Sequence, residues 1–327
     1  MPEERMRDPV LPDDLERELA RIAELAAGDV AGVFGPESVV WRVDREAAVF
    51  FGAGRALLLQ LAHPWVAAGI AEHSRTLSDP IARFHRTFDV MFTLIFGNLD
   101  QALAAARRLH RRHSVVQGSL PEPTGRYAAG ARYHANDAAA LRWVHATLVD
   151  TALLAHDLML PPLTSAERER YYGETRQLGA MFGLRDEEIP PDWAAFSSYR
   201  DGMLHSDELA VGPTARYIAD KVLAGAGSWL RAPGWYRTVT AHLLPPAIRE
   251  GFGLPYGERE RRSAERAVRW LRSVYPVLPT RLRHVGPYHE AMARLIGRTQ
   301  PDLLTQALNR LWIGHRTMQP KRRSGPG

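Results

Sequence analysis

The fold of this chain is decided by residues 78–118, which read SDPIARFHRTFDVMFTLIFG and then NLDQALAAARRLHRRHSVVQG. The first half carries apolar residues at helical spacing and stops at Gly97, a residue that commonly ends helices. The second, Ala-rich half begins at Asn98, a favoured N-cap. We therefore expect helices over 79–96 and 98–117. Because so short a connection leaves no room for a crossover, the two should form an antiparallel hairpin.

Counting along this hairpin brings four polar side chains to a similar level. At a rise of ~1.5 Å per residue, Arg83 lies about 22 Å from the turn and His113 about 23 Å. Arg86 and Thr87 are one turn nearer the connection, on the same face as Arg83. Two interpretations are open at this point. The four residues converge on one site, or they form a solvated stripe in which His113 ends a basic helix and interacts with its dipole.

The composition excludes several classes of function. The net charge is +5, but 40 of the 42 basic residues are Arg, spread along the chain and interleaved with acids, as in ERERR at 258–262. Ion pairs on helix surfaces explain this pattern better than a nucleic-acid-binding track. The absence of cysteine excludes disulfides, thiolate haem ligation, Fe–S clusters and a Cys nucleophile.

The N-terminus has no apolar core of signal-peptide length. The longest apolar region, 47–71, is interrupted by Arg55 and His63. Buried helices account for that region better than a membrane span. We therefore expect a cytoplasmic protein with no integral membrane segment and no nucleic-acid partner; its partner proteins cannot be deduced.

Almost every segment between the Pro and Gly breakers has the 3.6-residue period, and no series of alternating strands is recognisable. We predict an all-α fold with a single multi-helix domain at 41–318, preceded by an N-terminal helical extension at 1–40 and followed by a disordered tail at 319–327. The predicted helices span 12–27, 45–61, 64–74, 79–96, 98–117, 136–159, 165–182, 192–210, 213–225, 234–244, 259–275, 285–297 and 301–315.

Several polar or small residues fall inside apolar segments. Gly52 and Gly54 interrupt a helical pattern, which indicates close helix packing or the close approach of a ligand. His63 is either a hydrogen-bonded core residue or a ligand of a cofactor. Asp150 lies within the apolar helix 136–159. It needs an Arg or His partner, and we favour a structural polar network there over a metal site.

The usual motifs of soluble enzymes are missing. The sequence contains no His-Glu-x-x-His, no Glu-x-x-His, no G-x-S-x-G, no P-loop and no dinucleotide fingerprint. The lack of Glu-x-x-His argues against a carboxylate-bridged di-iron bundle. A cofactor pocket between helices is the remaining possibility, and a haem with a single His ligand meets its requirements.

Four motifs in succession carry a family resemblance: GRALLLQLAHPWVAAGIAEHS, RFHRT followed by FG, RRLHRRHSVVQG, and NDAAALRWVHATLVD. The chain resembles the MpaB-like oxygenase family, to which the bacterial latex-clearing rubber oxygenases also belong, from about Trp41 to about Gly286. The resemblance is close to the bacterial MpaB-like members and distant to the rubber oxygenases. It implies an all-helical, globin-like core that holds a b-type haem.

The resemblance also assigns roles to residues. His113, in His-Ser-Val-Val, matches the His-x-x-Val motif of the proximal iron ligand, and Arg83, Arg86 and Thr87 match the basic and Thr positions of the preceding helix. Rubber oxygenases have a Lys where this chain has Arg86. A guanidinium has no lone pair to offer iron, so Arg86 would pair with a haem propionate or steady bound oxygen. His63 is a further candidate for cofactor contact.

The resemblance therefore implies a haem-b-dependent oxygenase in which the iron is bound by His113. By analogy, O2 would add to a carbon–carbon double bond of a small apolar, isoprenoid-like molecule and cleave it to carbonyl products. Rubber itself is an improbable substrate because an export signal is missing, and the catalytic Glu of the rubber enzymes has no clear counterpart, with Glu72 as the one candidate. The alternatives are a haem-binding sensor or carrier without turnover, and a cofactor-free helical interaction protein.

Overall fold

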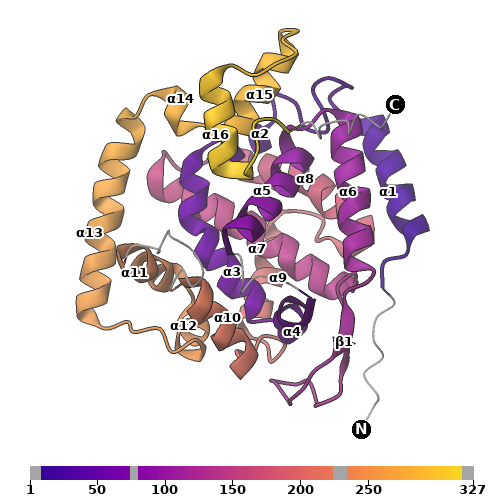
Figure 1. Cartoon of the computed structure of the whole chain (residues 1–327). Helices are drawn as coiled ribbons and strands as arrows, with labels where there is room; N and C mark the ends of the chain where they lie inside the picture. The colour runs from indigo at the N-terminus through magenta and orange to yellow at the C-terminus, as the bar shows by residue number, and fades with distance from the viewer. Residues whose placement is uncertain (1–8, 74–79, 224–233, 319–327) are drawn as a thin grey trace, which may run out of the picture.

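The computed structural model describes residues 9–73, 80–223 and 234–318, and it confirms the predicted all-α class (Figure 1). The α-helices described are α1 (Pro12–Leu25), α2 (Val39–Asp44), α3 (Ala53–Leu61), α4 (Pro64–His73), α5 (Pro80–Phe96), α6 (Leu99–His113), α7 (Ala138–Met159), α8 (Ser165–Met181), α9 (Trp193–His205), α10 (Pro213–Leu223), α11 (Gly234–Leu243), α12 (Pro246–Gly251), α13 (Glu258–Val274), α14 (Thr280–Arg283), α15 (Gly286–Leu295) and α16 (Leu303–Ile313). The 3-10 helices described are η1 (Ala47–Gly52), η3 (Asp186–Glu188) and η4 (Tyr275–Val277), and the strands are β1 (Gln117–Ser119) and β2 (Arg132–His134).

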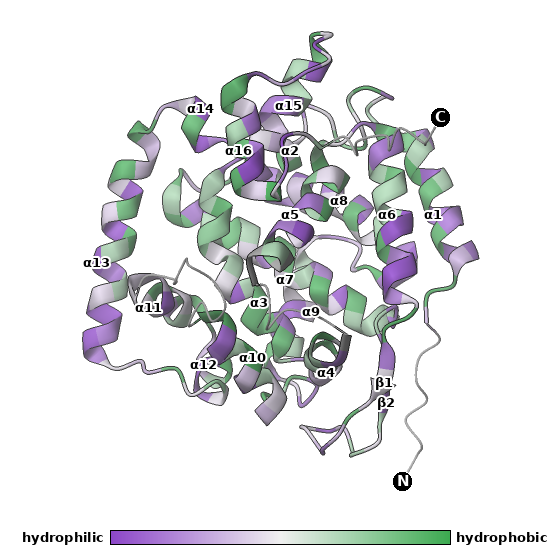
Figure 2. Ribbon diagram, in the orientation of Figure 1, coloured by the Kyte–Doolittle hydropathy of each residue, from purple (hydrophilic) through white to green (hydrophobic). Residues whose placement is uncertain are grey.

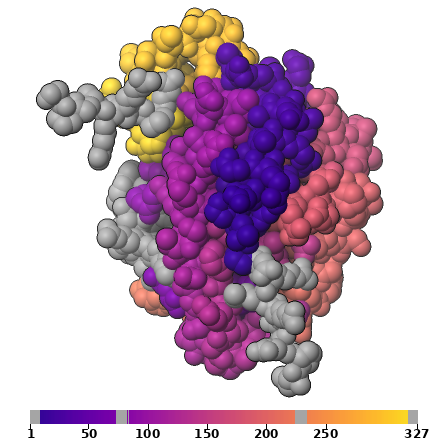
Figure 3. Space-filling view, turned by 90° about the vertical axis from the view of Figure 1, so that its right-hand side faces the viewer, coloured from indigo at the N-terminus to yellow at the C-terminus, as the bar shows by residue number. Residues whose placement is uncertain are grey.

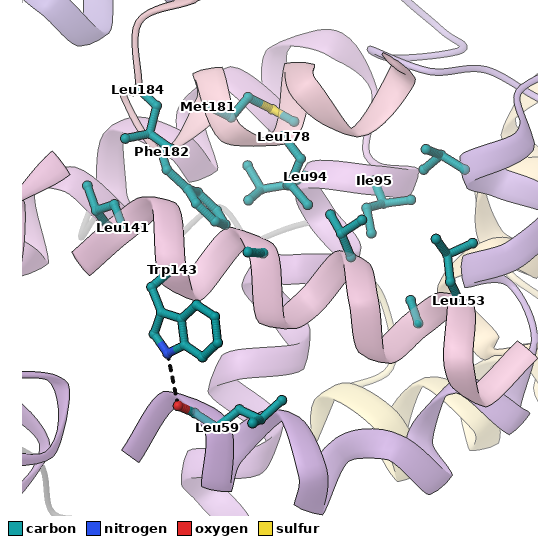
Figure 4. Close-up of a cluster of buried hydrophobic side chains, with 14 of the residues drawn as sticks. Leu59, Leu94, Ile95, Leu141, Trp143, Leu153, Leu178, Met181, Phe182 and Leu184 are labelled. Atoms are coloured by element: carbon teal, nitrogen blue, oxygen red, sulfur yellow. Dashed lines mark hydrogen bonds between the residues drawn. The ribbon is translucent and has the colours of Figure 1, made fainter. Parts of the chain in front are cut away.

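Helix α7 is the centre of the molecule. Buried residues are distributed around its whole circumference, which is the pattern of a helix enclosed by others. Leu178 and Phe182 cover one side of it from α8, and Trp143 points the opposite way, where its Nε1 donates a 2.9 Å hydrogen bond to the Leu59 carbonyl oxygen of α3 (Figure 4). The prediction of a core helix over 136–159 is confirmed.

Amphipathic helices surround this centre. In α1, Leu15, Leu19 and Ile22 recur at helical spacing and are buried, while the intervening charged residues face solvent. This helix lies along α6 and α8 on the face shown in Figure 3. Helix α13, at the opposite edge, alternates between hydrophilic and hydrophobic residues (Figure 2). The proposed domain boundary at residue 40 stays a prediction, and the tail at 319–327 lies outside the described residues.

The predicted helix over 45–61 is in fact two elements, η1 and α3. Gly52, at their junction, lies so close to α7 that a Cβ there would overlap the Cγ2 of Thr151. Gly54 is held in the same way against α11, where the hydroxyl of Tyr236 accepts a 2.9 Å hydrogen bond from its N–H. Of the two interpretations of these glycines, the structure confirms close helix packing.

Helix α6 is shorter than predicted, because it ends at His113 and the chain continues into a small β-ribbon. Strand β1 pairs antiparallel with β2, with Gly118 opposite Tyr133. The ribbon packs on α4, where Gly69 faces both Val116 and Tyr133. Strands of three residues are too short to show an alternating pattern, so no sign of them is visible in the sequence.

Candidate functional site

Helices α5 and α6 pack against each other as the predicted hairpin (Figure 1). The connection consists of Gly97 and Asn98. The Asn98 side chain accepts a 2.8 Å hydrogen bond from the Gln101 N–H, and the Gln101 side chain accepts one of 2.9 Å from the Asn98 N–H. This capping box fixes the start of α6. Arg83 and His113 consequently lie at similar distances, ~20 Å, from the connection along their helices.

The side chains of α5 have different environments around the helix. Phe88 and Phe92 pack on Phe50 of η1, with ring centroids 4.4 and 5.5 Å apart. Arg86 and Thr87, by contrast, are exposed. Among the described residues, Arg86 makes no ion pair or hydrogen bond.

The side chain of Arg83 lies outside the described residues, although its backbone belongs to α5. Its predicted convergence with His113, Arg86 and Thr87 therefore stays a prediction. The exposure of the latter two is compatible with a solvated stripe and equally with a surface that a ligand covers.

His113 is half-buried at the end of α6, beside β2 and the start of α7. Burial, together with repulsion from His110 and His134, lowers the pKa of its imidazole to about 4, against the opposing effect of the Asn136 side chain. The ring is therefore neutral near pH 7. A neutral imidazole has a nitrogen lone pair, which is what a metal ligand requires.

His63 immediately precedes α4. Its side chain is 1% exposed, and burial lowers its pKa to about 4. Its ring neighbours are Trp65 and Tyr127, with centroids 5.8 and 5.9 Å away. Within the described part of the chain, its Nδ1 has no hydrogen-bond partner. His63 is thus buried with an unsatisfied nitrogen, a state that normally requires a partner.

Glu72, the candidate counterpart of a catalytic Glu, has a structural contact. The hydroxyl of Tyr133 donates a 2.6 Å hydrogen bond to its Oε2, which joins the end of α4 to β2. Burial and this contact raise the pKa of Tyr133 above its ordinary value. We therefore assign no catalytic role to Glu72.

Asp150 belongs to a polar network, as predicted. Its Oδ2 accepts a 2.6 Å hydrogen bond from Nη2 of Arg55, and its Oδ1 accepts one of 2.9 Å from Nη1 of Arg200. Arg55 also donates to Thr151 at 2.6 Å. In the described ranges, no group of three or more His, Cys, Asp or Glu residues is arranged to hold a metal ion. A haem iron held by one His does not need such a group.

A cavity that no sequence pattern indicated lies between α2, η1, α5, α7 and α8. Its volume is ≈ 90 Å³ and its walls are mostly apolar. Asp44 and Tyr171 form a polar pair in the wall, in which the Tyr171 hydroxyl donates a 3.3 Å hydrogen bond to Asp44 Oδ2. Asp44 and Tyr171 are far apart in sequence, so their pairing could not be predicted from it. The sequence showed only an acidic residue at the end of the stretch VVWRVD.

Comparison with known proteins places the chain in a family. Residues 41–273 match the family described as "ER-bound oxygenase mpaB/B'/Rubber oxygenase, catalytic domain", and the chain belongs to this family. It is therefore a member of a family of oxygenase catalytic domains, an oxidoreductase class, as the four motifs predicted. No curated protein and no solved structure matches the chain. None of the helices in the described ranges is long and apolar enough to cross a membrane.

Proposed function

We propose that this protein is a haem-b-dependent oxygenase that adds O2 to an apolar, isoprenoid-like molecule, with His113 as the iron ligand. The observation that supports it most is the family match over 41–273, which includes the hairpin with RFHRT and His-Ser-Val-Val. The oxygenase class comes from that match. The haem, the cleaved double bond and the roles of individual residues are the parts that we propose.

The described residues fit a haem in three respects. His113 has a pKa of about 4, so its ring nitrogen is free of a second proton at neutral pH. Arg86 is an exposed cation without an ion pair among the described residues, and it suits a propionate group. His63 has a buried Nδ1 that lacks a partner within those residues, which suits a polar contact with the cofactor. The globin-like character of the core stays part of the proposal.

In this proposal the haem supplies the activation of O2, and the protein supplies position and charge. His113 would bind the iron as a neutral ligand. Arg83 and Arg86 would supply two positive charges and Thr87 a hydroxyl donor, and together they would stabilise negative charge that develops on oxygen. In the net reaction, one O2 and one carbon–carbon double bond yield two carbonyl groups, so the cleavage itself needs no external reductant.

The decisive experiment is the visible spectrum of the purified chain, with the haem content measured by the pyridine haemochrome method. Wild type should show a Soret band that is lost or shifted in His113→Ala. The matched control is His205→Ala, which removes an exposed His of α9. Circular dichroism verifies that helicity is retained. A colourless wild type, even after reconstitution, would contradict the cofactor assignment, and a Soret band unchanged in His113→Ala would contradict the ligand.

Substrate-dependent oxygen uptake separates an oxygenase from a haem-binding sensor or carrier. Haem-loaded protein should consume O2 when an isoprenoid with an internal double bond is added, and carbonyl products should accumulate in proportion. If the loaded protein consumes no O2 with any member of an isoprenoid panel, the enzymatic part of the proposal fails while the cofactor assignment stands.

A further inference from the structure

The cavity between α2, η1, α5, α7 and α8 has one polar end. Most of its wall consists of aliphatic and aromatic side chains, among them Val49, Phe92 and Ala152. At the polar end, Asp44 accepts the hydrogen bond from Tyr171, whose side chain is 2% exposed. We call this space the Asp44 cavity.

The protein supplies only part of the hydrogen bonding that the Asp44 carboxyl can accept. Oδ2 accepts the 3.3 Å bond from Tyr171, while the carboxyl forms no ion pair and Oδ1 receives no hydrogen bond within the described ranges. The hydroxyl of Thr175, another polar group of the wall, is already bonded to the Tyr172 carbonyl oxygen at 2.8 Å. Asp44 is half-buried, and the removal of its carboxyl from water raises the pKa of Asp44 to about 7.

An unpaired carboxyl in an apolar cavity is the arrangement expected of a ligand site, in which a few polar groups orient an otherwise apolar molecule. A water molecule would find partners only at the polar end, because the rest of the wall is apolar and supplies none, so water does not suit the remainder of the cavity. A ligand with one polar atom and an aliphatic remainder matches both parts of the cavity.

The protonation state of Asp44 determines which polar group of a ligand can bind to it. A hydroxyl group can donate to the carboxylate and can accept from the protonated carboxyl or from Tyr171, so it suits Asp44 in both protonation states. A ligand carboxylate would be repelled by the ionised form. An ammonium group would have to give up its hydration shell for one carboxylate in apolar surroundings, which is costly.

The volume sets the size of the ligand. A cavity of ~150 Å³ lined by apolar side chains holds benzene, which has six heavy atoms. By proportion, ≈ 90 Å³ takes about four heavy atoms. We propose that the Asp44 cavity binds a primary aliphatic alcohol, with its hydroxyl between Asp44 and Tyr171 and its first three or four carbons against the apolar wall. This inference does not depend on the proposed haem.

The test is ligand-observed NMR on the full chain with four probes of nearly equal size: 1-butanol, n-butylamine, butyrate and n-pentane. In wild type, 1-butanol should give saturation transfer and bind at least tenfold more tightly than any of the other three. This comparison needs no variant. Equal binding of all four, tighter binding of the amine, or no binding of 1-butanol would overturn the proposal.

Variants then locate the site. Tyr171→Phe and Asp44→Leu remove the polar end and should each weaken 1-butanol binding tenfold or more, while n-pentane binding is kept. Ala152→Leu fills the cavity and should abolish the binding of both. Asp201→Leu, an equivalent change on the exposed face of α9, is the control and should leave binding unchanged. Unaltered 1-butanol binding in Tyr171→Phe and Ala152→Leu, two changes on different walls, would place the alcohol elsewhere and refute the assignment.

Discussion

Replacing Asp44 by Asn should make the protein more stable at alkaline pH. Burial raises the pKa of this carboxyl from 3.8 to about 7 in the folded protein. A group whose folded pKa is raised contributes its full stability below the unfolded pKa, and that contribution is lost as the pH rises through the folded pKa. The difference between the two pKa values corresponds to about 4 kcal/mol at pH 8 and above. An Asn side chain at this position would carry no charge and would avoid this penalty.

The measurement is the free energy of unfolding in urea at pH 5 and pH 8 for wild type and Asp44→Asn. Between these pH values, wild type should lose about 2.5 kcal/mol relative to the variant, because all other titrating groups are common to both proteins. If Asn and Asp differ in hydrogen bonding by the same amount at both pH values, both free energies of unfolding shift equally, so this difference cannot produce the expected result. Asp201→Asn, at an exposed position, should follow wild type. If the Asp44→Asn and wild-type free energies run parallel across this range, Asp44 is ionised with an ordinary pKa and the reasoning is refuted.

Four further substitutions test the helix packing, the polar network around Asp150 and the role proposed for Arg83. Gly52→Ala should destabilise the fold by about 1–3 kcal/mol, because the added Cβ would overlap α7. Gly173→Ala on α8, where the added Cβ meets no other atom, should instead stabilise the fold by up to about 1 kcal/mol. Equal shifts of the melting temperature in the two variants would contradict this reasoning. Arg55→Ala should lower the free energy of unfolding in urea by about 3–5 kcal/mol, because it leaves the buried Asp150 carboxylate paired with Arg200 alone. A loss below about 1 kcal/mol would show that the network is dispensable. Arg83→Ala should retain the haem and lose oxygen uptake; wild-type turnover in this variant would remove Arg83 from the mechanism.

The hairpin could be predicted because its determinants are local. A helix period, a terminating Gly97 and a capping Asn98 act within a few residues of one another, and the structure reproduces all three. The requirement of Asp150 for a cationic partner was equally predictable, since a buried carboxylate is too costly to leave alone. Which cations pair with it could not be deduced. Arg55 and Arg200 lie 95 and 50 residues away along the chain.

The β-ribbon and the Asp44 cavity could not be predicted, because both depend on contacts between residues that are distant in sequence. The strands are too short for a period, and their pairing is supported by contacts of Gly118 and Gly69 with residues distant in sequence. Asp44 and Tyr171 are 127 residues apart and meet only because α2 and α8 pack together. An acid at the end of a helix resembles an ordinary surface residue until the packing of its neighbours is known.

Helix α5 contributes residues both to the proposed cofactor site and to the wall of the Asp44 cavity. Phe88 and Met91 line the cavity, whereas Arg86 and Thr87, their neighbours in sequence, are exposed. Each residue turns the helix by about 100°, so Arg86 points about 160° away from Phe88, whereas Thr87 lies one turn from Met91 and only about 40° away from it around the helix. An alcohol bound at Asp44 would therefore not touch Arg86. For this reason, substitutions of Asp44 test the alcohol without removing a proposed cofactor contact, and failure of either proposal leaves the other to be judged on its own measurements.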